Sequence, residues 1–179
     1  MFKKILLVLA IVAIIFVVVV SLRPADFHVT RSTTIAAPPA TIFPHINDLK
    51  KWQEWSPWAK IDPNCKVTFE GPVAGVGAIF RWDGNMQVGA GSMTETESQP
   101  NDRVQFKLDF LKPMQGTNTV VFTLKSEGAG TTVTWTTDGK NNFVGKAMGL
   151  FIDCDKMCGD QFEKGFADLK TIAENEVKK

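Results

Sequence analysis

The spacing of hydrophobic residues changes twice along this chain. An unbroken apolar run extends from Ile5 to Val20 and is prolonged by Ser21 and Leu22. From residue 66 to residue 135 apolar residues alternate with polar ones, and from residue 143 to residue 174 they recur at helical spacing. Alternation is typical of a strand with one wet face, and the helical stripe is typical of an amphipathic helix. The pattern therefore predicts an α+β domain behind an apolar N-terminal segment.

The predicted strands form one antiparallel sheet that is covered on one side. A first strand is expected at Phe27–Ile35, followed by alternating stretches at Val67–Phe69, Ala78–Trp82, Val104–Phe110, Val120–Leu124 and Val133–Trp135. Between them, residues 86–98 predict a long polar strand in which Gly89 and Gly91 mark a bulge or bend. Asp83-Gly84-Asn85 predicts a hairpin turn before it.

Helices are predicted at both ends of this strand series. A short one opens at Pro39 or Ala40 and runs to Ile46. A second is capped by Asn47 or Asp48, presents Leu49, Trp52 and Trp55 on one face, and stops at Ser56-Pro57. Residues 143–174 predict one long helix, which would cover the sheet. A curved sheet wrapped around such a helix usually leaves a gap, which is the natural place for a ligand.

The N-terminal apolar run is long enough to cross a membrane. As a helix, residues 5–22 would measure about 27 Å, close to the hydrocarbon thickness of a bilayer. A cleaved signal peptide is the alternative, but no A-x-A site is present, only a permissive Val19-x-Ser21. We expect an uncleaved transmembrane anchor at residues 1–23 and a second domain at residues 24–179.

Charge predicts the orientation of this anchor. Lys3 and Lys4 favour a cytoplasmic N-terminus, although Arg23 and Arg31 on the other flank weaken the argument. The expected location is the inner membrane of a bacterial cell, with the domain in the periplasm.

Three cysteines are an awkward number for an oxidising compartment, because at least one must stay unpaired.

Composition narrows the kind of partner. Of 20 Lys and Arg residues, two precede the apolar run, which leaves 18 against 19 Asp and Glu. Such a balance argues against a nucleic-acid binder. The chain has five Trp and 13 Phe but no Tyr, and three of the Trp fall at positions 52, 55 and 58. These rings favour apolar partners.

Several short motifs resemble those of the START-related helix-grip superfamily (SRPBCC), in its polyketide cyclase/dehydrase-like branch. They include Trp52-x-x-Trp55-Ser-Pro-Trp58, Gly75-Val-Gly77-Ala, Gly89-x-Gly91-Ser92-Met93, Phe110-x-Lys112-Pro113, Val133-Thr-Trp135, Asp155-Lys-Met157-x-Gly159 and Phe162-Glu-Lys-Gly165. The resemblance implies a helix-grip fold in which a curved antiparallel sheet wraps around a long C-terminal helix. It also implies an apolar cavity for lipids, sterols, polyketides or hormones, and carries over no fixed catalytic set.

The leading hypothesis is a membrane-tethered module that binds an apolar small molecule or lipid. Nine residues are predicted to face the ligand: Trp82, Phe106, Phe122, Trp135, Phe151, Cys154, Cys158, Gln161 and Phe162. Gln161 is the candidate polar contact, although it is equally suited to reach water. Gly165, on the same stripe, leaves room for close packing or for a ligand.

Other hypotheses remain open at this stage. A cyclase or hydrolase would need a convergent acid and base, of which His45 beside Asp48 is the best candidate. The spacing of Cys154 and Cys158 suits a metal, but thiols in an apolar stripe usually act as small hydrophobes, so no metal, cofactor or catalytic residue is assigned. A third hypothesis is an interaction module whose cavity is filled by its own side chains.

Overall fold

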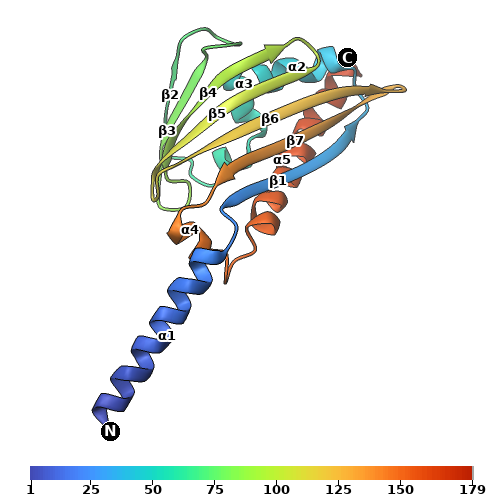
Figure 1. Cartoon of the computed structure of the whole chain (residues 1–179). Coiled ribbons are helices and arrows are strands. Elements are labelled where there is room, and N and C mark those ends of the chain that lie inside the picture. Colours follow the sequence, from blue (N-terminus) through green and yellow to red (C-terminus); the bar gives the residue numbers. More distant parts are fainter. Residues whose placement is uncertain (179) are drawn as a thin grey trace.

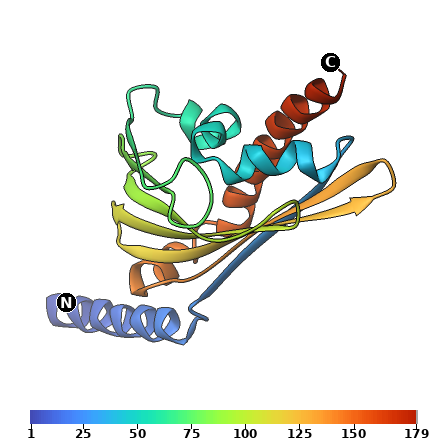
Figure 2. The same cartoon turned by 90° about the horizontal axis from the view of Figure 1, so that it is seen from above.

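One antiparallel sheet and one long helix dominate the computed structural model, which describes residues 1–178 (Figure 1). The strands are β1 (Asp26–Ile35), β2 (Lys66–Glu70), β3 (Ile79–Asp83), β4 (Ala90–Gln99), β5 (Arg103–Lys112), β6 (Gly116–Glu127) and β7 (Gly130–Lys140). Their order in the sheet is β1-β7-β6-β5-β4-β3-β2. The sheet curves around α5 (Cys154–Val177), which confirms the predicted helix-grip fold (Figures 1 and 2).

Short helices between β1 and β2 close one end of this grip. They are α2 (Pro39–Asn47), α3 (Leu49–Trp55) and the 3-10 helix η1 (Pro57–Lys60). The Asp48 side chain caps α3 by accepting from the Lys50 N–H at 2.8 Å, as the sequence predicted. Trp52 and Trp55 are both buried on the face of α3 that meets the sheet. All three helices contact one another or α5, so they form the second layer of the domain together with it.

The polar strand is shorter than predicted. β4 begins at Ala90 because residues 85–89 form a turn in which the Asn85 side chain accepts from the N–H groups of Gln87 and Val88. Gly89 follows with a φ of +65°, a conformation that favours glycine. The predicted irregularity is confirmed, since the register with β5 shifts between Ala90 and Gly91.

The single helix predicted for residues 143–174 is wrong in one respect. The structure has a short helix, α4 (Phe143–Met148), then a connection at residues 149–153, and only then α5. Asn142 caps α4 and Asp153 caps α5, each through a side-chain oxygen that accepts a backbone N–H. Two caps within twelve residues divide a stripe that is apolar throughout.

The apolar N-terminal run forms α1 (Phe2–Leu22), which projects away from the domain (Figure 1). An 18-residue stretch of α1 has a mean hydropathy of 3.6, and only 6% of that stretch is buried. By length and composition it is the one helix among residues 1–178 that suits a membrane span, and a signal sequence would fit the same description. An exposed helix this apolar is stable only in an apolar environment.

Candidate functional site

Buried aromatic rings pack between the sheet and the helices α3 and α5. Trp135 of β7 stacks on Phe162 of α5 with ring centroids 4.1 Å apart and planes only 4° from parallel. Trp52 meets Trp135 and Phe122 edge to face at 5.4 Å each, and Phe106 lies 5.8 Å from Trp52. All five are buried. These five rings form one buried cluster between the strands and the helices, which we call the aromatic floor. Four of them were predicted to face a ligand: Phe106, Phe122, Trp135 and Phe162.

Gly165 allows α5 to approach this floor closely. A Cβ there would lie 3.2 Å from the Trp135 ring, 3.2 Å from Pro57 and 3.4 Å from the Trp55 ring. These separations are at or below ordinary contact distance, so the missing side chain is needed for packing. Of the two interpretations of Gly165 from the sequence, close packing is the one that its surroundings support.

Apolar side chains from four elements around these rings remain half-buried. Trp82 of β3, Leu108 and Phe110 of β5, Trp58 of η1 and Cys158 of α5 are all partly exposed. Trp82 packs edge to face on Phe110 at 6.1 Å, and four of the five also contact the buried core. We call these five residues the open site. Apolar side chains that are neither fully covered nor free in water are what a hydrophobic ligand can cover further.

The backbone fixes the Trp82 ring at the edge of the open site. Its Nε1–H donates to the Val88 carbonyl at 3.1 Å, so the polar atom is satisfied within the β3–β4 turn. The ring lies across Gly91, its partner on β4, where any Cβ would touch it. The two glycines of the Gly89-x-Gly91 motif thus have different roles: Gly89 allows the turn, and Gly91 leaves space for the Trp82 ring.

Cys158 of the open site and Cys154, one turn before it, both lie half-buried on the first turns of α5. Burial raises the pKa of the Cys158 thiol to about 11, with Cys154 and Asp155 adding to the effect. A protonated thiol is a poor metal ligand and a poor nucleophile. Within residues 1–178 no group of three or more His, Cys, Asp or Glu could hold a metal ion.

Two of the nine predicted residues lie apart from the others. Phe151 is 81% exposed, because it belongs to the connection between α4 and α5 and not to the helical stripe. Gln161 lines a shallow groove of about 420 Å³ between η1 and α5, outside the aromatic floor. The groove is partly polar, and the ion pair between Lys60 and Asp168 spans it at 2.5 Å. It is separate from the open site, which carries the apolar chemistry.

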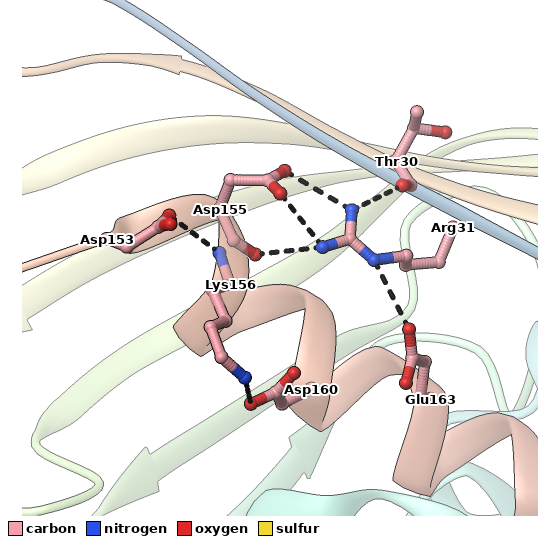
Figure 3. Close-up of polar contacts among 7 residues, drawn as sticks. All are labelled: Thr30, Arg31, Asp153, Asp155, Lys156, Asp160 and Glu163. Atoms are coloured by element: carbon pink, nitrogen blue, oxygen red, sulfur yellow. Dashed lines mark hydrogen bonds and ion pairs between the residues drawn. The ribbon is translucent and has the colours of Figure 1, made fainter.

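Arg31 of β1 fastens the start of α5 to the sheet (Figure 3). Its guanidinium donates to both carboxylate oxygens of Asp155, at 3.2 and 2.9 Å, and to the Asp155 carbonyl at 3.2 Å. Glu163 lies 3.5 Å from its Nε, and Thr30 accepts another bond through its carbonyl. Arg31 lowers the pKa of Asp155, and Gly159 leaves the space in which the guanidinium lies. This contact holds the helix that bears Cys158 in place.

Glu95 is a buried carboxyl group that the sequence did not single out. It is 1% exposed on β4, where Oε2 accepts from the Gly75 N–H at 3.1 Å and Oε1 has no partner. Burial raises the pKa of Glu95 to about 7, although hydrogen bonds from Ser98 and Gly75 oppose the shift. The residue follows Met93 on the inward face of β4, and this two-residue spacing was the only available signal.

The two histidines have structural partners. His45 is buried, and its Nε2 lies 3.1 Å from Glu176 near the end of α5, so it does not pair with Asp48 as the enzyme hypothesis required. Its carbonyl accepts from the Trp55 Nε1–H at 2.8 Å. His28 is exposed and pairs across strands with Asp138 at 2.6 Å. Neither ring reaches the open site.

Solved structures of similar fold come from several organisms. Protein CV1439 from Chromobacterium violaceum has 14% sequence identity and a TM-score of 0.61, covering 82% of this chain and 96% of its own. The Aha1 dimer from Colwellia psychrerythraea has 17% identity and a TM-score of 0.59, covering 83% and 96%. Ginseng major latex-like protein 151 from Panax ginseng has 14% identity and a TM-score of 0.58, covering 82% and 97%. At such identities the likeness establishes the fold alone.

A family model gives the decisive comparison. The model described as polyketide cyclase / dehydrase and lipid transport matches residues 26–174, which is nearly the whole domain behind α1. The chain belongs to this family. The match confirms the resemblance drawn from the motifs, and no curated protein matches the chain. Membership supports hydrophobic ligand binding as the general property, without specifying a ligand or a reaction.

Proposed function

We propose that the protein is a membrane-tethered module that binds an apolar small molecule or lipid at the open site. The observation that carries the proposal is the partial burial of Trp58, Trp82, Leu108, Phe110 and Cys158 around a closed aromatic floor. A polyketide cyclase / dehydrase and lipid transport family supports the same class of ligand. The ligand would lie between the sheet and the first two turns of α5.

The residue roles follow from burial. Trp82, Cys154 and Cys158 are half-buried and would contact the ligand directly. Phe106, Phe122, Trp135 and Phe162 are buried and would form the base on which it rests. We retain these seven of the nine predicted residues and leave out Phe151 and Gln161, which lie elsewhere.

The membrane tether is α1, and its orientation is part of the proposal. An apolar helix of 21 residues suits an uncleaved span, and Lys3 with Lys4 favours a cytoplasmic N-terminus. In a bacterial cell the domain would then be held at the periplasmic face of the inner membrane. Such a position suits a module that collects an apolar molecule from the bilayer.

Blocking the open site tests the proposal. The full chain is purified in mild detergent, transferred to nanodiscs of one synthetic phospholipid, and extracted so that retained molecules can be identified by mass spectrometry. Cys158→Trp adds a bulky ring at the open site, while Lys156→Trp adds the same ring to the exposed face of α5. We expect a retained apolar species in the wild type and in Lys156→Trp, and its loss in Cys158→Trp. Equal retention in all three proteins would show that the ligand binds elsewhere.

An enzyme acting on an apolar substrate is the second candidate, and one observation bears on it. Glu95 supplies a carboxyl group whose pKa of about 7 would suit proton transfer at neutral pH. Its hydrogen-bond partners among the described residues are the Gly75 N–H and the Ser98 side chain. Neither of them is a second titratable group that could complete an acid–base pair. The binding function therefore remains the better supported one.

A further inference from the structure

An apolar surface lies exposed at the end of the domain that carries α1. Five large hydrophobic side chains within ten residues are exposed by 39–81%: Phe143, Val144, Met148, Phe151 and Ile152. We call them the α4 patch. Single exposed hydrophobic residues are ordinary, but a group of this density marks a surface that something apolar covers.

The α4 patch lies beside the end of α1. Helix α1 packs on α4, Val20 is fully buried, and the Lys146 ammonium donates to the Ser21 carbonyl at 3.1 Å. Both views show α4 next to the last turn of α1, and the connection to α5 also reaches this end of the domain (Figures 1 and 2). A 21-residue helix is about 31 Å long, so its last turn lies near the bilayer surface when the helix spans the hydrocarbon.

The short tether leaves the domain little freedom to move away from the bilayer. Only Arg23, Pro24 and Ala25 separate α1 from β1, and three extended residues reach about 10 Å. The Asn141 N–H also donates to the Ala25 carbonyl at 2.7 Å, which ties the tether to the segment that leads into α4. With α1 across a bilayer, this short tether would hold the α4 patch at the level where the acyl chains meet the headgroups.

The residues around the patch suit this level. Arg23 and Lys140 are exposed and Lys146 is half-buried, although Asp26 and Asp153 are exposed in the same segments; basic residues near apolar ones are common in segments that lie in a membrane interface. We propose that the α4 patch inserts into the headgroup–acyl boundary of the bilayer that α1 spans. The patch is a second membrane contact, distinct from the anchor.

This contact would bring the open site to the membrane. Cys154 begins α5 two residues after Ile152, so the patch leads directly to the helical turn that bears Cys158 of the open site. An apolar molecule could then pass from the bilayer to the site without crossing water. This part of the inference rests on the proposed ligand binding, whereas insertion of the patch rests only on the proposed membrane tether.

Photo-crosslinking of the full chain tests the insertion. A benzophenone amino acid is placed singly at Phe151, Val144, Val8 or Val73, and each protein is irradiated in vesicles of one synthetic phosphatidylcholine. Val8 lies within α1 and reports whether the anchor is in contact with lipid. Val73 is 69% exposed in the β2–β3 loop, at the opposite end of the sheet from α4, and serves as the matched exposed control. Lipid adducts are measured by mass spectrometry.

We expect lipid adducts at Val8, Phe151 and Val144, with the latter two at least about fivefold above Val73. Adducts at Val8 but only background at Phe151 and Val144 would overturn the insertion and leave the tether intact. No adduct at Val8 would contradict the tether itself. Crosslinked protein dimers at Phe151 would show that a second copy covers the patch and would also overturn the insertion.

One further variant separates the bilayer from a lipid bound at the open site. Cys158→Trp is combined with the label at Phe151. An adduct that persists comes from the bilayer and supports the insertion, whereas an adduct that disappears comes from the open site and contradicts it. Binding and insertion can therefore fail independently.

Discussion

Replacing Glu95 by glutamine should change how the stability of the protein depends on pH. Glu95 is 1% exposed on β4, and burial raises the pKa of its carboxyl group from 4.5 to about 7. Glutamine has nearly the same shape and can still accept the Gly75 N–H through its amide oxygen. The substitution therefore removes the titration with little change in packing.

The sign and size of the effect follow from the two pKa values. The folded state holds the Glu95 proton more tightly than the unfolded chain, so this group favours folding below pH 4.5 and loses that contribution as the pH rises to about 7. One pKa unit corresponds to about 1.4 kcal/mol, so the whole loss amounts to about 3 kcal/mol. Above this window the wild type contains a buried carboxylate without a charged partner among the described residues, which is costly.

Guanidinium unfolding of the full chain in mild detergent, followed by tryptophan fluorescence, measures this difference. Between pH about 5 and about 8, the free energy of unfolding of Glu95→Gln relative to the wild type should rise by about 2–3 kcal/mol. Glu97→Gln, on the half-exposed part of the same strand, is the control and should show no comparable rise. A pH-independent difference for Glu95→Gln would refute the assignment of Glu95 as a buried acid.

Three further predictions concern the floor and the open site. Phe162→Ala removes the ring stacked on Trp135 and should lower the free energy of unfolding by about 3–5 kcal/mol in the same assay; a loss below about 1 kcal/mol would contradict the packing described. Gly165→Val should cost about 1–3 kcal/mol, because the added carbons would collide with Trp135 and Pro57; a more stable variant would show that helix propensity outweighs this contact. Cys158 should resist iodoacetamide near pH 8 in the folded protein and react after denaturation, since its pKa is about 11; rapid native labelling, located by peptide mass mapping, would be inconsistent with that value.

The fold could be predicted well from the sequence because each hydrophobic pattern extends over many residues. Strand alternation around Phe106 and Phe122 and the stripe through Phe162 indicated a sheet against a helix, and that arrangement is present. The division into α4 and α5 was missed because apolar residues continue through Phe151, while the break depends on the Asp153 cap. A cap is a local hydrogen bond, and periodicity does not report it.

The candidate site was only partly predictable. Apolar residues on one face of a strand are expected to turn inward, and Trp82 and Trp135 both lie against the core. Their depth depends on packing between distant elements, so the sequence could not separate the buried floor from the open site. Gln161 lies in the groove against η1 because of where that short helix packs, which no local pattern records. Glu95 was hidden among polar neighbours on β4.

Mapping the contact site of a photoreactive fatty acid would locate the bound ligand in the fold. The full chain in nanodiscs is incubated with a fatty acid that carries a diazirine near its methyl end, irradiated, digested and analysed by mass spectrometry. We expect adducts on the peptides that contain Trp82, Phe110 and Cys158, and their loss in Cys158→Trp but not in Lys156→Trp. Adducts confined to α1, or equally frequent at the groove around Gln161, would contradict an apolar binding site between the sheet and α5.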